Sequence, residues 1–165
     1  MWWLLAPNPF IIVADAAPRT LEQPDAGVRL DPLGAIGEVF SKRAGDGLAI
    51  PWHQDGQYWP IRPLATCSVW IALDESTPKN GCLRYIPGSQ VTQRVRRHAL
   101  ASTETYTLNQ KLLAEEFDEA EARDVVLEAG QISLHDVYMI HGSMPNRSPK
   151  RRAGYVLRFM PTTSH

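Results

Sequence analysis

The sequence has few cysteines, no excess charge of either sign and no long uninterrupted hydrophobic run. Its two cysteines, Cys67 and Cys82, are too few for a disulfide scaffold and lack the paired spacing of a structural zinc site. The 17 Lys and Arg residues against 18 Asp and Glu residues leave a net charge of -1, so no positive field attracts a phosphate backbone. We therefore expect two buried thiols in a reducing cytosol and no nucleic-acid partner.

The apolar residues at the N-terminus are interrupted too soon for a secretion signal or a membrane span. Residues 1–5 and 10–13 are mostly apolar, but the Pro-Asn-Pro of residues 7–9 separates them, and no Lys or Arg precedes Arg19. We expect a cytoplasmic protein that does not enter a membrane.

The length of 165 residues, 44% of them hydrophobic, indicates one globular domain over residues 1–165 that can bury a core and a ligand. Residues 14–34 are rich in Ala, Pro, Asp and Gly and show no sustained period. We therefore assign residues 1–35 to a peripheral N-terminal segment.

Short strand-like runs dominate the chain from Ile36 onward. They are rich in β-branched and aromatic residues and are separated by Gly and Pro, at residues 38–42, 66–73, 82–86, 125–127, 131–137 and 155–160. One stretch, residues 108–123, has near-helical spacing of Leu112, Leu113 and Phe117 and predicts a short helix inserted between strands. Many short strands with one helix favour an all-β barrel or jelly roll.

A histidine and an aspartate two residues apart, His53 and Asp55, form the first part of a candidate metal site. In an extended segment, side chains at this spacing project from the same face, so both can reach one ion. Two histidines and one carboxylate on one face of an iron leave three coordination positions open. A chelating 2-oxo acid takes two of them and dioxygen the third, which is the arrangement that an oxygenase needs.

Four other histidines are candidates for the third ligand. His165 is the terminal residue, and His98 lies in a basic run that is better explained as a solvated face. His135 lies within the strand-like run 131–137, and His141 follows this run directly, beside a glycine that permits close backbone approach. The residues alone leave His135 and His141 open.

Two separated motif blocks, in matching order, resemble the phytanoyl-CoA dioxygenase family. The first contains His-Gln-Asp at 53–55, Trp-Ile-Ala-Leu-Asp at 70–74, Asn-Gly-Cys-Leu at 80–83 and Ile-Pro-Gly-Ser at 86–89. The second contains His-Gly-Ser at 141–143, followed by Asn146, Ser148 and Arg152. The resemblance extends over residues 40–160 and implies a double-stranded β-helix, a jelly roll of the cupin type.

The resemblance also implies roles for individual residues. It makes His53, Asp55 and His141 the catalytic residues and iron ligands, with His135 as a neighbour. The cofactor-binding arginine of the family, eleven positions beyond the distal histidine, falls on Arg152. A guanidinium suits a carboxylate because its donors form a fork.

Three further residues complete the expected cofactor site. Arg151 is a rival to Arg152 only if the preceding loop is one residue shorter than in the family, and alternation along a strand would point the two side chains to opposite faces. Ser143 resembles a serine that touches the same carboxylate. Trp70 resembles an aromatic residue that lines the cofactor pocket, and it is equally well explained as a core tryptophan.

The implied activity is that of an Fe(II)- and 2-oxoglutarate-dependent dioxygenase. It would use O2 to hydroxylate an unactivated C–H bond of a small-molecule substrate and release succinate and CO2. Related halogenating enzymes have a small residue in place of the carboxylate ligand, so Asp55 favours hydroxylation. The sequence does not choose among acyl thioesters, amino acids and secondary metabolites as the substrate.

Two alternatives remain, a catalytically inactive metal-binding cupin-like protein and a zinc hydrolase, neither of which needs a 2-oxo acid. Only 52 residues precede His53, fewer than is usual in the family. This indicates a shortened natural form, a misassigned start, or a chain that completes its pocket by forming a homo-oligomer.

Overall fold

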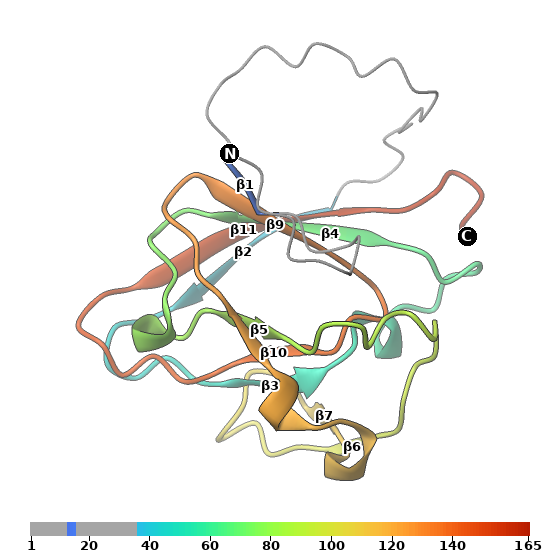
Figure 1. The fold of residues 1–165 in the computed structure, drawn as a ribbon, viewed down its shortest axis with the longest axis horizontal. Helices are drawn as coiled ribbons and strands as arrows, with labels where there is room; N and C mark the ends of the chain where they lie inside the picture. The colour runs from blue at the N-terminus through green and yellow to red at the C-terminus, as the bar shows by residue number, and fades with distance from the viewer. Residues whose placement is uncertain (1–12, 16–35) are drawn as a thin grey trace.

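The computed structural model describes residues 13–15 and 36–165, and in them two antiparallel sheets form two layers (Figure 1). The larger sheet has the strand order β1 (Val13–Asp15), β9 (Gln131–Asp136), β4 (Cys67–Ala72), β11 (Arg152–Phe159) and β2 (Ile36–Lys42). The smaller sheet has the order β3 (Ile50–His53), β10 (His141–Ser143), β5 (Leu83–Tyr85) and β8 (Arg123–Val125). This arrangement confirms the double-stranded β-helix.

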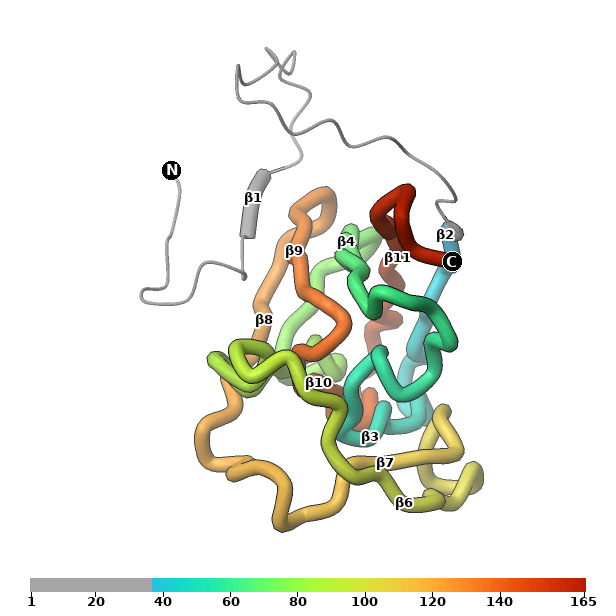
Figure 2. Tube along the Cα trace, turned by 90° about the vertical axis from the view of Figure 1, so that its right-hand side faces the viewer, coloured from blue at the N-terminus to red at the C-terminus, as the bar shows by residue number. Residues whose placement is uncertain are grey.

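A short hairpin of β6 (His98–Leu100) and β7 (Gln110–Leu112) lies beside β3 (Figure 2). Four 3-10 turns complete the described elements: η1 (Asp55–Gln57), η2 (Pro78–Asn80), η3 (Ala114–Glu116) and η4 (Glu119–Glu121).

The core lies between the two sheets because the strands alternate buried and partly exposed side chains. In β4, Ser68, Trp70 and Ala72 are buried and their neighbours are partly exposed, which is the period of two that a strand imposes. The core cluster contains Trp70, Ala72, Leu83, Tyr85, Val125, Leu127, Met139 and Val156. Each fully buried aliphatic side chain of this kind contributes about 1.5–3 kcal/mol to folding.

The register of the larger sheet brings distant segments into rows on its inner face. His135 on β9, Ser68 on β4 and Arg158 on β11 are direct cross-strand partners at one end of the sheet. Lys42 on β2 and Arg152 on β11 are partners at the other end. Side chains from four segments of the chain therefore face the same interior space.

The helix expected over residues 108–123 does not form, and this prediction is wrong. The segment contains β7 and the turns η3 and η4 instead. Leu112 packs against Ile86 and Ile140, and Phe117 packs against Trp52, with ring centroids 5.4 Å apart. Tertiary packing onto the outer face of the smaller sheet thus overrides the local helical spacing.

The other predicted strands differ from the observed strands mainly in where they begin and end. The run 125–127 is displaced, since β8 covers Arg123–Val125 and Leu127 forms an isolated bridge with Ser76. Both cysteines are free thiols, as predicted, but only Cys82 is buried, and Cys67 is partly exposed. In the described part of the chain, no helix has the length and apolarity to cross a membrane. The peripheral segment 1–35 lies outside the described residues except for β1, a strand that the sequence did not predict.

Candidate metal centre

His53, Asp55 and His141 come together between the sheets. One potential ligand atom from each lies within 4.8 Å of the others, and all three residues are buried. Asp55 Oδ1 lies 3.5 Å from His53 Nε2 and 3.6 Å from His141 Nε2. Both imidazoles thus face the same carboxylate oxygen.

Strand register and a local turn produce this cluster. His53 ends β3 and is the direct cross-strand partner of His141 on β10, so the two imidazoles lie side by side with ring centroids 4.2 Å apart. Gln54 is extended, and Asp55 then begins the turn η1, which directs its carboxylate back toward the histidines. The sequence predicted an extended segment from His53 to Asp55. The segment is extended through Gln54, and a turn begins at Asp55.

The Gln54 side chain fixes this segment from behind. Its amide donates to the carbonyls of Arg94 and Tyr138, at 2.9 and 2.7 Å, and accepts from the Arg96 N–H at 2.7 Å. Gln54 is fully buried, so every one of these contacts replaces a lost contact with water. The residue between the two candidate ligands is thus a structural anchor.

The donor set fits a divalent iron ion. His53 Nδ1 lies 2.8 Å from the Pro51 carbonyl and His141 Nδ1 lies 3.0 Å from the Met139 carbonyl. A carbonyl oxygen only accepts, so each Nδ1 carries the proton and each Nε2 offers a lone pair toward Asp55. Two imidazole nitrogens and one carboxylate form the facial set that non-haem Fe(II) prefers.

The ionisation states agree with metal binding. Burial lowers the pKa of His141 well below its usual range, and nearby His53 lowers it further, so this imidazole is neutral. Burial by itself raises the pKa of Asp55, but the hydrogen bond with His135 and the nearby His141 and His53 outweigh it and hold the pKa well below its usual range. A neutral imidazole and an ionised carboxylate are the forms that bind a metal ion.

The second oxygen of Asp55 is held on the opposite side. Ser68 Oγ donates to Oδ2 at 3.1 Å, and His135 Nε2 lies 3.5 Å from the same atom. The Tyr85 hydroxyl in turn lies 3.0 Å from His135 Nδ1. Because a hydroxyl can donate to Nδ1, His135 can keep its own proton on Nε2, directed at Asp55. His135 therefore supports the carboxylate, and it lies outside the His53–Asp55–His141 cluster.

A cavity of about 590 Å³ contains this cluster and also the expected cofactor residues Arg152 and Trp70. Arg152 is 1% exposed, donates twice to the Gly81 carbonyl, and places its guanidinium carbon 5.3 Å from the centroid of Trp70. Burial lowers its pKa to about 10. The cationic end of the cavity is thus made by a guanidinium stacked on an aromatic ring.

Lys42 is a cavity residue that sequence reasoning missed. It is 4% exposed, lies opposite Arg152 across the strand pair, and donates to the carbonyls of Ser143 and Met144. Burial, followed by the charge of Arg152, lowers its pKa to about 7. Among the described residues, neither Lys42 nor Arg152 is paired with a carboxylate. The sequence offers no local signal that Lys42 faces inward, since lysine is a residue type that is mostly exposed.

The structure separates the two candidate arginines. Arg151 is 63% exposed at its side chain and forms a two-point ion pair with Asp74, at 2.8 and 3.0 Å. Arg152, its neighbour on β11, points the other way into the cavity. Alternation along the strand accounts for the difference.

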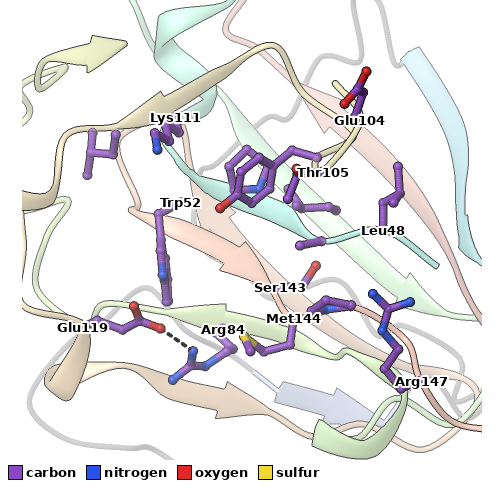
Figure 3. Close-up of a pocket in the computed structure, with 16 residues that line it drawn as sticks. Leu48, Trp52, Arg84, Glu104, Thr105, Lys111, Glu119, Ser143, Met144 and Arg147 are labelled. Atoms are coloured by element: carbon purple, nitrogen blue, oxygen red, sulfur yellow. Dashed lines mark hydrogen bonds and ion pairs between the residues drawn. The ribbon is translucent and has the colours of Figure 1, made fainter. Parts of the chain in front are cut away.

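Ser143 does not line the cavity of the metal cluster, although its carbonyl lies 3.5 Å from Lys42 Nζ. It lines a second cavity of about 590 Å³ together with Trp52 and the ion pair of Arg84 and Glu119 (Figure 3). Its hydroxyl is buried and has no hydrogen-bond partner within the described part of the chain. Contact between Ser143 and a cofactor therefore stays a prediction.

The remaining histidines lie elsewhere. His98 Nε2 accepts from the Gln54 N–H and its Nδ1 lies 2.8 Å from the Arg96 carbonyl, so both ring nitrogens are used within the protein. His165 is exposed at the C-terminus. Tyr58 and Trp59, which follow Asp55 in the chain, line the cavity of the metal cluster.

Comparison with known proteins now identifies the family. Residues 12–154 match the sequence profile described as Phytanoyl-CoA dioxygenase (PhyH). The chain belongs to the phytanoyl-CoA dioxygenase family. This confirms the resemblance predicted from the two motif blocks.

Two relatives are identical to this chain at about one residue in three. A Dictyostelium discoideum protein named phytanoyl-CoA dioxygenase domain-containing protein 1 homolog is 33% identical over 136 residues, covering 81% of this chain and 48% of its own length. A probable alpha-ketoglutarate-dependent hypophosphite dioxygenase of Stutzerimonas stutzeri is 32% identical over 108 residues, covering 64% and 37%. The chain thus spans about half or less of the length of these curated relatives.

Solved structures agree with the family's fold. EvdO2 of Micromonospora carbonacea var. aurantiaca, solved with 2-oxoglutarate, is 29% identical with a TM-score of 0.67, and the match covers 78% of this chain and 52% of EvdO2. The family membership, this neighbour and the His–Asp–His cluster together support the predicted cofactors Fe(II), 2-oxoglutarate and O2.

Proposed function

We propose that the chain is an Fe(II)- and 2-oxoglutarate-dependent dioxygenase that hydroxylates an unactivated C–H bond of a small organic molecule, releasing succinate and CO2. The observation that carries the proposal is one cavity with two complementary ends. One end holds the cluster of His53, Asp55 and His141, and the other holds the buried cations Lys42 and Arg152. A dicarboxylate that chelates a metal through one end and carries a charge at the other fits both.

In this proposal, His53 Nε2, His141 Nε2 and one oxygen of Asp55 hold the iron. When bound, Fe(II) with 2-oxoglutarate and O2 supplies the oxidant for the C–H bond. These three buried residues would leave the other coordination positions of the iron to 2-oxoglutarate and O2. Because the chain keeps the Asp55 carboxylate, hydroxylation is favoured over halogenation.

Arg152 and Lys42 would bind the far carboxylate of 2-oxoglutarate. Burial disfavours the charged forms of both groups, most clearly for Lys42, whose pKa it lowers to about 7, and an anionic ligand would stabilise these charges by charge-assisted hydrogen bonds. Trp70 holds the Arg152 guanidinium from one face, and its ring forms part of the cavity wall. A protein that only stored metal, or a zinc hydrolase, would gain nothing from this cationic end.

Anaerobic titration of the iron-loaded protein with 2-oxoglutarate tests the proposal. A 2-oxo acid that chelates Fe(II) through two atoms gives a weak visible charge-transfer band, and we expect this band to saturate with added 2-oxoglutarate. Succinate, which has no keto oxygen, is the matched control and should give no band. A folded, iron-loaded protein without the band would contradict the proposal and favour the inactive metal-binding protein.

The support of Asp55 gives a second prediction. Ser68→Ala removes a donor to Asp55 Oδ2, and loss of such an outer contact typically weakens metal binding by about 10–100-fold. Ser76→Ala is the matched control, because Ser76 is equally buried but its hydroxyl has no hydrogen-bond partner among the described residues. Fe(II) titration by calorimetry compares the two. Equal affinity in both variants would show that Ser68 does not position the carboxylate.

A cytoplasmic location, a single domain over residues 1–165 and assembly into homo-oligomers stay predictions. Light scattering during gel filtration would test the last of these on the full chain.

A further inference from the structure

The inner face of β11 carries a second arginine that the proposed chemistry does not use. Arg152 and Arg158 both line the cavity of the metal cluster, and the even spacing between them puts both on one face of the strand. Six residues of strand separate their backbones by about 20 Å. A single 2-oxoglutarate held by Arg152 cannot also be held by Arg158, so the second cation serves a different group.

Arg158 lies at the end of the sheet where Asp55 is supported. It is the direct cross-strand partner of Ser68, whose hydroxyl donates to Asp55 Oδ2. Directly opposed residues on neighbouring strands project from the same face. The Arg158 side chain therefore emerges beside the metal cluster, where a substrate must lie to be oxidised.

The guanidinium of Arg158 is held in place, but not all of its hydrogen-bond donors have a partner among the described residues. Its central carbon lies 5.6 Å from the ring centroid of Phe40 and 5.5 Å from that of Trp59. Nη1 donates to the Glu38 carboxylate at 2.7 Å, and the Glu38 side chain is 51% exposed. Nε, in contrast, is buried and has no hydrogen-bond partner among the described residues. A buried donor without an acceptor is costly, and a ligand is one explanation for it.

The surroundings of Arg158 indicate the chemical class of that ligand. Phe40, Tyr58, Trp59 and Leu108 line the same cavity and offer apolar and aromatic surface. The Nε side of a guanidinium matches a planar carboxylate, which accepts two parallel hydrogen bonds. An organic acid with an apolar body would satisfy both features.

We propose that Arg158, held between Phe40 and Trp59, binds the carboxylate of an apolar organic acid and so orients the C–H bond of this substrate toward the metal. The inference rests on the proposed oxygenase function and names the substrate class of the same site. Arg158 is then a specificity-determining residue, separate from the co-substrate arginine at the other end of β11.

The test uses the full chain loaded anaerobically with Fe(II) and 2-oxoglutarate. The probes are 3-phenylpropionate and its neutral analogue 3-phenylpropionamide, and the readout is the shift of the charge-transfer band as each is added. We expect the acid to bind at least about tenfold more tightly than the amide, which is the effect of one charge-assisted contact.

Arg158→Gln should remove this preference, weakening the acid about tenfold and leaving the amide unchanged. Arg158→Lys, which keeps the charge and loses the fork, should lie between the two. Arg151→Gln is the control for loss of an arginine charge, because Arg151 directly precedes β11, is exposed and is paired with Asp74, so this variant should behave as the wild type. With 2-oxoglutarate alone, Arg158→Gln should give the same charge-transfer band as the wild type, which verifies that its co-substrate site is intact.

The outcomes separate the two proposals. If the band forms but the two probes shift it equally, or neither shifts it, or Arg158→Gln keeps the preference for the acid, the substrate proposal is wrong and the oxygenase proposal stands. If the wild type gives no band at all, the oxygenase proposal fails and the role of Arg158 fails with it.

Discussion

Replacing His53 or His141 with alanine is expected to abolish Fe(II) binding and turnover together. Each imidazole directs Nε2 at the same oxygen of Asp55 while its Nδ1 is occupied by a backbone carbonyl. Loss of an outer contact alone costs about 10–100-fold in metal affinity, so loss of a ligand should exceed about a hundredfold. Anaerobic calorimetric titration with Fe(II), with circular dichroism to verify folding, measures the effect.

The histidines outside the cluster provide the controls. His165→Ala should bind iron normally, since His165 is exposed at the C-terminus. His135→Gln should bind iron more weakly but measurably, because His135 Nε2 faces Asp55 Oδ2 and not the oxygen that His53 and His141 share, and its ring packs beside that of His141 with centroids 4.6 Å apart. If a His135 variant lost iron while His141→Ala retained it, the ligand assignment would be wrong.

Replacing Arg152 with alanine is expected to weaken 2-oxoglutarate binding by about a hundredfold or more and to leave Fe(II) affinity nearly unchanged. The buried guanidinium is the strongest candidate for the far carboxylate, and truncating one partner of a buried charge pair costs about 2–5 kcal/mol. The charge-transfer titration gives the 2-oxoglutarate affinity, and the iron titration gives the metal affinity of the same sample.

Arg151→Ala is the matched control for this variant. Arg151 is adjacent in sequence, but it is exposed and paired with Asp74, so its loss should leave 2-oxoglutarate binding as in the wild type. An effect of Arg151→Ala in place of Arg152→Ala would mean that the other arginine binds the co-substrate. A normal 2-oxoglutarate affinity in both variants would show that neither arginine binds the far carboxylate of 2-oxoglutarate.

The predicted helix shows where reasoning from the sequence failed. Leu112, Leu113 and Phe117 have near-helical spacing, but Leu112, which is buried, and Phe117, which is partly buried, pack against residues from distant segments of the chain. Spacing within the segment carries no information about the hydrophobic surface that Ile86, Ile140 and Trp52 present to it. The competing packing, which decides the conformation, is visible only in three dimensions.

Local sequence also could not distinguish His135 from His141 as the third ligand, or Arg151 from Arg152 as the cofactor arginine. The residues alone did not separate His135 from His141, and the resemblance selected His141. The structure shows the reason, because the register of β10 against β3 pairs His141 with His53, whereas β9 carries His135 to the opposite oxygen of Asp55. Similarly, the structure places Arg152, the first residue of β11, in the cavity and leaves the preceding Arg151 exposed and paired with Asp74.

The sequence by itself determined the family, the all-β class and the His-x-Asp motif, because these depend on residues close together in the chain and on motif order. Only the tertiary structure decided that Lys42 joins Arg152, that Ser68 and His135 support Asp55, and that Arg158 lines the same cavity as the metal cluster. These contacts join segments up to about a hundred residues apart. Their geometry is set by strand register and sheet packing, which no local pattern of residues specifies.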